Sequence, residues 1–596
     1  MATAEQPQLA PRSSQAPGGS RRWAWPGLAL VLAGGLALRL WGVQQGLPYV
    51  YNTDEADHFV PRAVKMFQDG SLNPHYFANP PAFTYLLHYL FDVWYGGPEG
   101  VLRAFELHPG NVYTLARVAA ALLGVGALWL LYATGARLFG RGVGLLAAAI
   151  EAVAFLPVFY AHLALNDVPT LAPLTLSLFG SAGVLRKGRM RDYLIAAIGL
   201  GLACATKYTA GIVLLVLLAA AVVRYLQGDA RARRRVVAML ALCALVTLVA
   251  FLIANPYSLL DYHSFHRELV HQSTLSAEAQ GKLGAPKDGG LAYYLWSLTW
   301  GLGWAPAVAA LGGAVAIWRV EPRARLGAVG WLLVPAPLVY LAFMGLQGRY
   351  FGRWLLPIFP MLCLLGAFFA LQLVLAAGRL AAPRALAGAL GAVLVAVLLA
   401  QGLLYSVHSG LVLSRADTRN LTRAWMLAHV PKGAAVVAEP VSPDDWARET
   451  PALPSHSNPY RWIKYPSLLS RLGPHGRIQA NATHEVGIED YERTLAPALI
   501  GYYESRGYCW VISGTTQSGR AFADPSAVPQ AIAYYRALAR QGEVVYRSSP
   551  YARGHGGGRD SVPFGFDWSF DYYPLAYHRP GPVMTVYRLH GGRCAP

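Results

Sequence analysis

The sequence predicts a polytopic α-helical membrane protein that ends in an α/β domain outside the cytoplasm. Of its 596 residues, 55% are hydrophobic and only 14% are charged, and the mean hydropathy is +0.33. Because soluble domains carry about 25% charged residues, this composition excludes a soluble enzyme of several domains. The 12% of aromatic residues excludes a disordered chain, which lacks the apolar surface needed for folding.

About eleven segments are apolar over roughly 20 residues, which is the length that a helix needs to cross a bilayer. The fifth and sixth of them are short and meet at Lys207. The segments lie near residues 23–46, 111–133, 143–161, 168–185, 192–206, 208–226, 236–255, 291–318, 327–346, 354–378 and 386–407.

The loops between these segments alternate between basic and non-basic. Cytoplasmic loops carry an excess of Lys and Arg, so the basic loops and the N-terminus are expected in the cytoplasm of a multi-pass protein of the cell membrane. The net charge of +18 is explained by these loops, and we expect no nucleic-acid partner. The basic loops contain Arg137 and Arg141, Arg186–Arg191, Arg231–Arg235, Arg319–Arg325, and Arg379 and Arg384.

The chain is expected to have three parts. A disordered cytoplasmic tail (1–22) precedes a membrane domain (23–407) that holds the catalytic residues. The external loops of this domain, 47–110 and 256–290, are too long to be simple connectors. Residues 408–596 are polar and contain no spanning segment, so they form the external α/β domain.

The pattern within this last part alternates between helices and strands. Cys509 and Cys594 both lie in it, outside the cytoplasm, where a disulfide can persist, but the sequence leaves their pairing open. Apolar runs and helical periodicity predict helices at 417–429 and 526–541 and strands at Ala434–Ala438, Cys509–Ser513, Val544–Tyr546 and Val583–Tyr587.

Charges within or beside a membrane are costly and indicate function. The strongest group follows the first span and contains Asp54, Glu55, Asp57 and His58. Further groups are His162 with Asn166-Asp167 in a short external loop, Lys207 between two spans, and Arg349, Tyr350 and Arg353 before a late span. Arg39 and Arg117 lie in or near spans, where snorkelling or pairing with acids is an equal alternative to catalysis, and Glu151 lies inside the third span with no partner evident from the sequence.

Each group also has a purely structural interpretation. The acids after the first span are compatible with a helix start, and Asn166-Asp167 with a turn. Lys207 is compatible with a snorkelling lysine, and the arginines near Tyr350 with an interfacial aromatic belt. The functional interpretation is favoured because the topology puts Asp54, Asp167, Lys207 and the two arginines on the same external side.

Taken in order along the chain, these motifs resemble the GT-C superfamily of membrane glycosyltransferases. The similar branch contains the protein O-mannosyltransferases and the lipid A aminoarabinose transferase, and the resemblance covers roughly residues 25–410. The motifs are Asp54-Glu55, Asn79-Pro80-Pro81 with Phe83-Thr84-Tyr85, Asn166-Asp167-Val168-Pro169, Ala205-Thr206-Lys207-Tyr208, and Arg349-Tyr350 followed by Trp354-Leu355-Leu356-Pro357.

The resemblance implies transfer of a sugar from a polyprenyl-phosphate donor to a protein, lipid or cell-envelope glycan outside the cytoplasm, with membrane lipids around the enzyme. Asp54 would be the base of an inverting reaction, with Glu55 and Asp167 as further catalytic carboxylates. Lys207, Arg349 and Arg353 would bind the donor phosphate. His58, His162, Asn79 and Tyr350 would orient the substrates.

One position departs from this family. The aminoarabinose transferase has a phosphate-binding lysine where this chain has Asn79, so the other cations must bind the phosphate, and aminoarabinose is less favoured as the sugar. No His, Asp or Glu spacing demands a metal, so none is expected, although some GT-C enzymes use a divalent cation.

Two other functions fit a membrane protein with few intramembrane charges. A transporter or lipid flippase has such charges, but the sequence shows no inverted repeat. A non-catalytic scaffold of envelope assembly would not need the acids.

Overall fold

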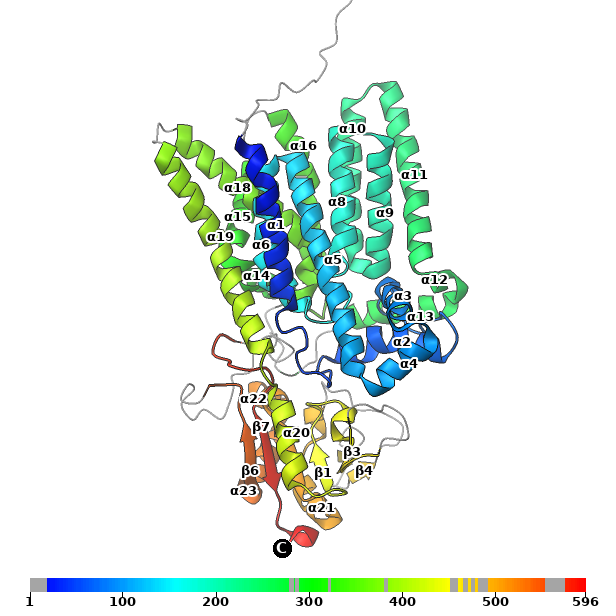
Figure 1. The fold of residues 1–596 in the computed structure, drawn as a ribbon, viewed down its shortest axis with the longest axis vertical. Coiled ribbons are helices and arrows are strands. Elements are labelled where there is room, and N and C mark those ends of the chain that lie inside the picture. The colour runs from blue at the N-terminus through cyan, green and yellow to red at the C-terminus, as the bar shows by residue number, and fades with distance from the viewer. Residues whose placement is uncertain are drawn as a thin grey trace, which may run out of the picture.

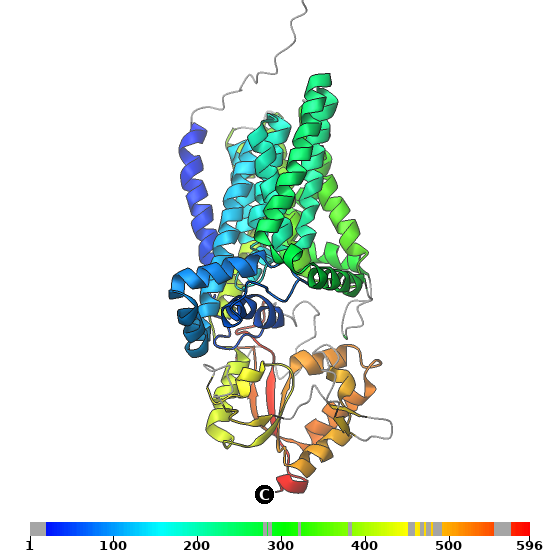
Figure 2. The same ribbon diagram turned by 90° about the vertical axis from the view of Figure 1, so that its right-hand side faces the viewer.

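The computed structural model describes residues 19–277, 283, 289–319, 323–379, 384–450, 459–464, 470–472, 478–480, 491–552 and 574–595. Most of the predicted cytoplasmic tail, residues 1–18, lies outside them. Figures 1 and 2 show a bundle of long helices joined to a mixed domain that ends in the C-terminus, with short helices between the two.

Every predicted spanning segment is largely helical. The segment at 143–161 is interrupted at Ala154 and forms two helices. The bundle contains α1 (Gly19–Leu40), α5 (Pro109–Leu138), α6 (Arg141–Val153), α7 (Phe155–Tyr160), α8 (Leu171–Arg186), α9 (Met190–Thr206), η2 (Tyr208–Ile212), α10 (Val213–Gln227), α11 (Ala230–Ala254), α14 (Gly290–Leu298), η3 (Thr299–Gly303), α15 (Trp304–Ala316), α16 (Arg323–Leu333), α17 (Pro335–Gly345), η4 (Gly352–Ile358), α18 (Phe359–Arg379) and α19 (Arg384–Leu413).

These helices make the chain a multi-pass membrane protein. Among the described residues, seven helices are long and apolar enough to cross a membrane by length and composition, and Ala24–Leu40 and Leu171–Arg186 are shorter apolar helices. The predicted count of about eleven spans is not confirmed. The physical reason is length, since α6 has 13 residues and α9 has 17.

Both long external loops contain helices, which lie between the bundle and the C-terminal domain in Figure 1. The break between the first span and α2 contains a π-helical turn, which begins directly after Asp54. The first loop forms η1 (Glu55–Phe59), α2 (Val60–Gln68), α3 (Ala82–Tyr95) and α4 (Pro98–Leu107), and the second forms α12 (Tyr257–Leu260) and α13 (Tyr262–Ala277).

The C-terminal domain is α/β, as predicted. Its five-stranded sheet has the order β2-β1-β5-β7-β6, in which β2, β1 and β5 are parallel and β7 is antiparallel to both of its neighbours. The elements are α20 (Thr418–His429), β1 (Ala435–Ala438), η5 (Asp444–Ala447), β2 (Ile463–Lys464), β3 (Ser470–Leu472), β4 (Ile478–Ala480), η7 (Tyr491–Thr494), α21 (Ala498–Arg506), β5 (Trp510–Gly514), α22 (Thr515–Ala523), α23 (Pro529–Gln541), β6 (Glu543–Ser548), β7 (Met584–Arg588) and η8 (Gly592–Cys594).

The predicted helices of this domain correspond to α20 and α23, and the predicted strands to β1, β5, β6 and β7. The sequence pattern missed α21, α22 and the short strands β2, β3 and β4. These strands have only two or three residues each, which is too short for a visible alternation of apolar and polar positions.

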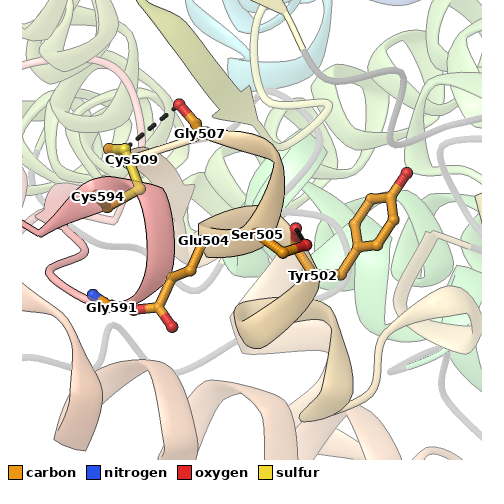
Figure 3. Close-up of a disulfide and its surroundings, with 7 residues drawn as sticks. All are labelled: Tyr502, Glu504, Ser505, Gly507, Cys509, Gly591 and Cys594. Atoms are coloured by element: carbon orange, nitrogen blue, oxygen red, sulfur yellow. Dashed lines mark hydrogen bonds between the residues drawn. A yellow bond between two sulfur atoms is a disulfide. The ribbon is translucent and has the colours of Figure 1, made fainter.

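The C-terminus is fastened to the domain by a disulfide between Cys509 and Cys594, whose Cα atoms are 5.3 Å apart. This settles the pairing that the sequence left open. Next to it, the Gly591 backbone N–H donates to Glu504 Oε1 of α21 at 2.8 Å (Figure 3). The end of the chain is thus connected both to the residue before β5 and to α21.

Loss of this disulfide should destabilise the C-terminal domain. The bond closes a loop with a sequence separation of 85 residues, for which the chain-entropy relation gives about 4.5 kcal/mol. We expect Cys509→Ser/Cys594→Ser to lower the denaturant midpoint of the domain, measured by tryptophan fluorescence. Cys204→Ser, which alters a free thiol in the bundle, is the control, and equal midpoints in all three proteins would contradict the expectation.

A buried carboxyl group joins the two central parallel strands of the domain. Glu439 follows β1 and is fully buried. Its Oε2 accepts hydrogen bonds from Ser513 Oγ and from the Gly514 backbone N–H, both at 2.9 Å. Burial raises the pKa of Glu439 to about 7, because desolvation outweighs these hydrogen bonds to the charged form.

The stability of the domain should therefore depend on pH. Between pH 4.5 and 7 the folded Glu439 keeps a proton that the unfolded chain, with an ordinary pKa of 4.5, releases, so stability falls as pH rises. Relative to wild type, Glu439→Gln should gain up to about 3 kcal/mol between pH 5 and pH 8, measured by thermal unfolding. Asp445→Asn, at a half-exposed carboxylate that pairs with Arg448, should show no such gain, because an arginine keeps its charge over this range. Parallel pH trends in wild type and Glu439→Gln would refute the expectation.

Candidate active site

A cavity of ≈ 790 Å³ is lined by residues of the two long loops, 47–110 and 256–290, and of the adjoining ends of membrane helices. Most of the predicted site residues meet there, although they are spread over about 300 positions, half of the 596-residue chain. They are Asp54, His58, Asn79, Asp167, Lys207, Arg349 and Arg353. The structure therefore brings the predicted acids and cations together in one cavity on one side of the protein.

Asp54 faces this cavity immediately before the π-helical turn η1. Arg353 Nη2 donates to Asp54 Oδ2 at 2.6 Å, yet the Asp54 side chain is still 39% exposed. Asp54 makes no capping hydrogen bond with its side chain, and Asn52 Oδ1 instead accepts from the Glu55 N–H at 3.0 Å. Asn52, and not Asp54, therefore makes the hydrogen bond expected at a helix start. The Asp54 carboxylate faces the cavity.

Asp167 and Lys207 form a buried ion pair in the same cavity. Asn166 Nδ2 donates to the Thr206 carbonyl at 2.7 Å, which holds their two chain segments together. Since Lys207 is buried and paired, it is not a snorkelling lysine.

Arg353 links this pair to Asp54. Its Nε lies 3.9 Å from Asp167 Oδ2, and its guanidinium lies 4.7 Å from the centre of the Phe351 ring. The cavity therefore contains a row of alternating charges, Asp54, Arg353, Asp167 and Lys207, in which each carboxylate is next to a cation.

Uncharged hydrogen-bonding groups line another part of the cavity. The His58 ring stacks on Tyr76 at 4.4 Å between centroids, and Asn79 Nδ2 donates to the Tyr76 hydroxyl at 2.7 Å. Burial lowers the pKa of His58, although nearby Asp54 opposes this shift, so the imidazole is neutral at pH 7. Arg349 is placed by its backbone N–H, which donates to the Ser276 carbonyl of α13 at 3.2 Å.

Glu55 does not line the cavity, in contrast to its predicted contact with substrate. It is fully buried, and both carboxylate oxygens accept from Arg117, at 2.7 and 2.8 Å. Oε1 also accepts from the Ala164 N–H at 2.8 Å. Because this carboxylate is fully buried and both of its oxygens are bonded to protein groups, the geometry gives Glu55 a positioning role.

His162 and Tyr350 also lie outside the cavity lining. The His162 ring is buried and its nitrogens contact the carbonyls of Trp41 and Phe159, at 3.0 and 3.2 Å. Tyr350 is buried against Tyr293, with 4.7 Å between ring centroids. The prediction that these two residues orient substrates was based on position along the chain, which does not show that tertiary packing encloses both rings.

The sequence interpretation missed several residues of the site. Arg117 was noted as a charge near a span, but its partner Glu55 is 62 positions away. The cavity residues on α13 and around it carry no motif and gave no signal; they include Gln272, Ser273, Ser276 and Gln347. Among the described residues, no group of three or more His, Cys, Asp or Glu side chains is arranged to hold a metal ion.

Comparison with known proteins identifies the fold. Residues 103–257 match the family model described as dolichyl-phosphate-mannose-protein mannosyltransferase. None of the curated proteins matches the sequence.

Two solved structures resemble the whole chain. Oligosaccharyltransferase AglB from Archaeoglobus fulgidus, in complex with an inhibitory peptide and a dolichol-phosphate, superposes with a TM-score of 0.52 at 12% identity, over 89% of this chain and 74% of AglB. ArnT from Cupriavidus metallidurans in the apo state superposes with a TM-score of 0.50 at 14% identity, over 96% of this chain and 98% of ArnT. The fold is that of the GT-C membrane glycosyltransferases, which confirms the predicted resemblance.

The pair of Glu55 and Arg117 should be essential for the fold around the cavity. Arg117→Met leaves the Glu55 carboxylate buried without its cation, which costs about 3–5 kcal/mol. We expect a lower midpoint of thermal unfolding for the purified protein in lipid nanodiscs. The double variant Glu55→Gln/Arg117→Met, which has no uncompensated charge, should recover part of the loss; a double variant that is worse than the sum of its single variants would argue against this pairing.

Proposed function

We propose that this protein is an inverting glycosyltransferase that moves a sugar from a polyprenyl-phosphate donor to an acceptor on the outer face of the cell membrane. The observation that carries the proposal is the row of alternating charges, with an accessible Asp54 at one end and buried Lys207 at the other. The GT-C fold supports it, and so does AglB, which shares this fold and whose structure contains a dolichol-phosphate. Because fold alone does not give function, the argument depends on the site.

Asp54 is the proposed base. An acceptor hydroxyl is a weak nucleophile, and a positioned carboxylate that takes its proton accelerates attack by roughly 10²–10⁴-fold. The hydroxyl oxygen bonds to the anomeric carbon from the face opposite the phosphate, and the bond from that carbon to the phosphate oxygen breaks. The proton ends on Asp54 and the electron pair on the lipid phosphate, so the configuration at the anomeric carbon is inverted.

Lys207, Arg349 and Arg353 are the proposed phosphate ligands. Negative charge grows on the leaving phosphate, and fixed cations stabilise it most where water is excluded. Arg353 is suited to this task because a guanidinium can bond to two phosphate oxygens at once. Asp167 contacts Lys207 and approaches Arg353, so it would hold both cations in place when the donor is absent.

The uncharged side of the cavity is proposed to bind the sugar. His58, Tyr76 and Asn79 offer neutral donors and acceptors of hydrogen bonds, which suit sugar hydroxyl groups. Because Asn79 is uncharged where the aminoarabinose transferase has a lysine, the phosphate would be bound by cations from other elements.

The remaining assignments are part of the same proposal. The N-terminus and basic loops would be cytoplasmic and the C-terminal domain extracytoplasmic, where the acceptor is a protein, lipid or cell-envelope glycan. The transferred sugar would be a hexose or a pentose. No feature of the described residues favours a transporter, flippase or scaffold.

Replacing Asp54 tests this proposal directly. The purified protein in lipid nanodiscs is offered labelled undecaprenyl-phosphate sugars of several kinds together with a membrane-fraction acceptor. We expect sugar transfer by the wild type and a rate at least about 10²-fold lower for Asp54→Asn, with donor binding retained.

Asp57→Asn is the matched control, because Asp57 lies in the same turn, is exposed and does not line the cavity. It should transfer sugar at the wild-type rate. Equal rates for Asp54→Asn and wild type would remove Asp54 from the mechanism, and a wild type that neither binds nor transfers any donor would refute the proposed function.

A further inference from the structure

The chain segment that leads into Asp54 is held by the C-terminal domain as well as by the bundle. Tyr49 is buried in the same apolar cluster as Met426, Val430 and Trp446 of that domain. Arg423 of α20 lies 5.2 Å from the centre of the Tyr49 ring. The core of the C-terminal domain thus includes a side chain from the first external loop.

Tyr51 makes a second and more polar contact with α20. Its hydroxyl donates to Asn420 Oδ1, and Asn420 Nδ2 donates to the Gly46 carbonyl at 3.1 Å. A single amide side chain therefore binds the loop at two points, five positions apart, and Tyr51 itself lines the cavity.

Arg419 covers the ring of Tyr51. Its guanidinium lies 3.5 Å from the ring centre, a distance suited to cation–π attraction. The guanidinium is fixed from behind by the fully buried Asp417, at 2.8 and 2.9 Å. Arg419 is thus a rigid surface against which Tyr51 packs.

The other end of the same segment is held by the bundle. Arg117 donates to the carbonyls of Val43 and Gln45, at 2.8 and 2.9 Å. Between this anchor and Asp54, Val50 packs in the apolar core of the bundle, and the flanking Tyr49 and Tyr51 contact the C-terminal domain. Asp54 lies only three positions after Tyr51, so a displacement of Tyr51 displaces the carboxylate.

We propose that Arg419 and Asn420 are positioning residues for Asp54, acting through Tyr51, and that the C-terminal domain is thereby a working part of the active site. This inference rests on the proposed function of Asp54 as the base. A base is effective only within a fraction of an ångström of its productive position, and a loop between two anchors can provide that accuracy where a free loop cannot.

The first test needs no substrate. Hydrogen exchange is measured on peptides that cover residues 43–58, in full-length protein in lipid nanodiscs, for wild type, Arg419→Ala and Asn420→Ala. We expect faster exchange in both variants. The control is Arg506→Ala, which removes a similar contact, 5.6 Å above the Tyr502 ring, from α21 at the end of the domain far from the bundle (Figure 1); it should exchange like wild type.

The second test measures sugar transfer with the undecaprenyl-phosphate sugar that the wild type uses. We expect kcat to fall at least tenfold in both variants with little change in the KM for donor, because the phosphate ligands are untouched. Tyr51→Phe, which loses only the hydroxyl, should cost less than Asn420→Ala, which also loses the bond to the Gly46 carbonyl, and combining the two should cost no more than Asn420→Ala alone.

The outcomes separate the two proposals. Wild-type exchange rates in both variants, or faster exchange with an unchanged kcat, would overturn the positioning role. Faster exchange together with a wild type that transfers no sugar would overturn the proposed function while upholding the contact between α20 and the loop.

Discussion

The ion pair between Glu55 and Arg117 is the interaction on which the rest of the site depends. It joins α5, the turn after Asp54 and, through the Ala164 N–H, the loop that carries Asp167. Its members are fully buried, and a buried charge without its partner is costly. The pair therefore fixes two acids of the cavity relative to each other, although it contacts neither substrate directly.

The charges that line the cavity are also paired with opposite charges, as Glu55 and Arg117 are. Lys207 and Arg353 are held by Asp167 and Asp54, so no cation of this row is buried alone. Unlike Glu55, these groups border open space of ≈ 790 Å³. In the proposed reaction, the donor phosphate would enter that space and replace carboxylate partners of the cations.

The C-terminal domain packs against the loop that leads into Asp54. Tyr49 packs in its core and Tyr51 contacts α20, so the residues before Asp54 belong to two structural units at once. These contacts between residues near 50 and residues near 420 are the basis of the positioning role proposed for this domain.

The sequence by itself determined the class of the protein. Local properties were enough for this: apolar runs mark membrane helices, and Asp54, Asp167, Lys207 and Arg353 stand out because charges beside a membrane are rare. Only the tertiary structure decided which charges face the cavity and which hold the fold. Asp54 and Glu55 are neighbours with the same chemistry, yet one carboxylate is 39% exposed and the other is enclosed by Arg117. His162 and Tyr350 were equally ambiguous. The reason is that a side chain's role depends on its partners, which here come from segments tens to hundreds of residues away, and local sequence patterns carry no record of such distant contacts.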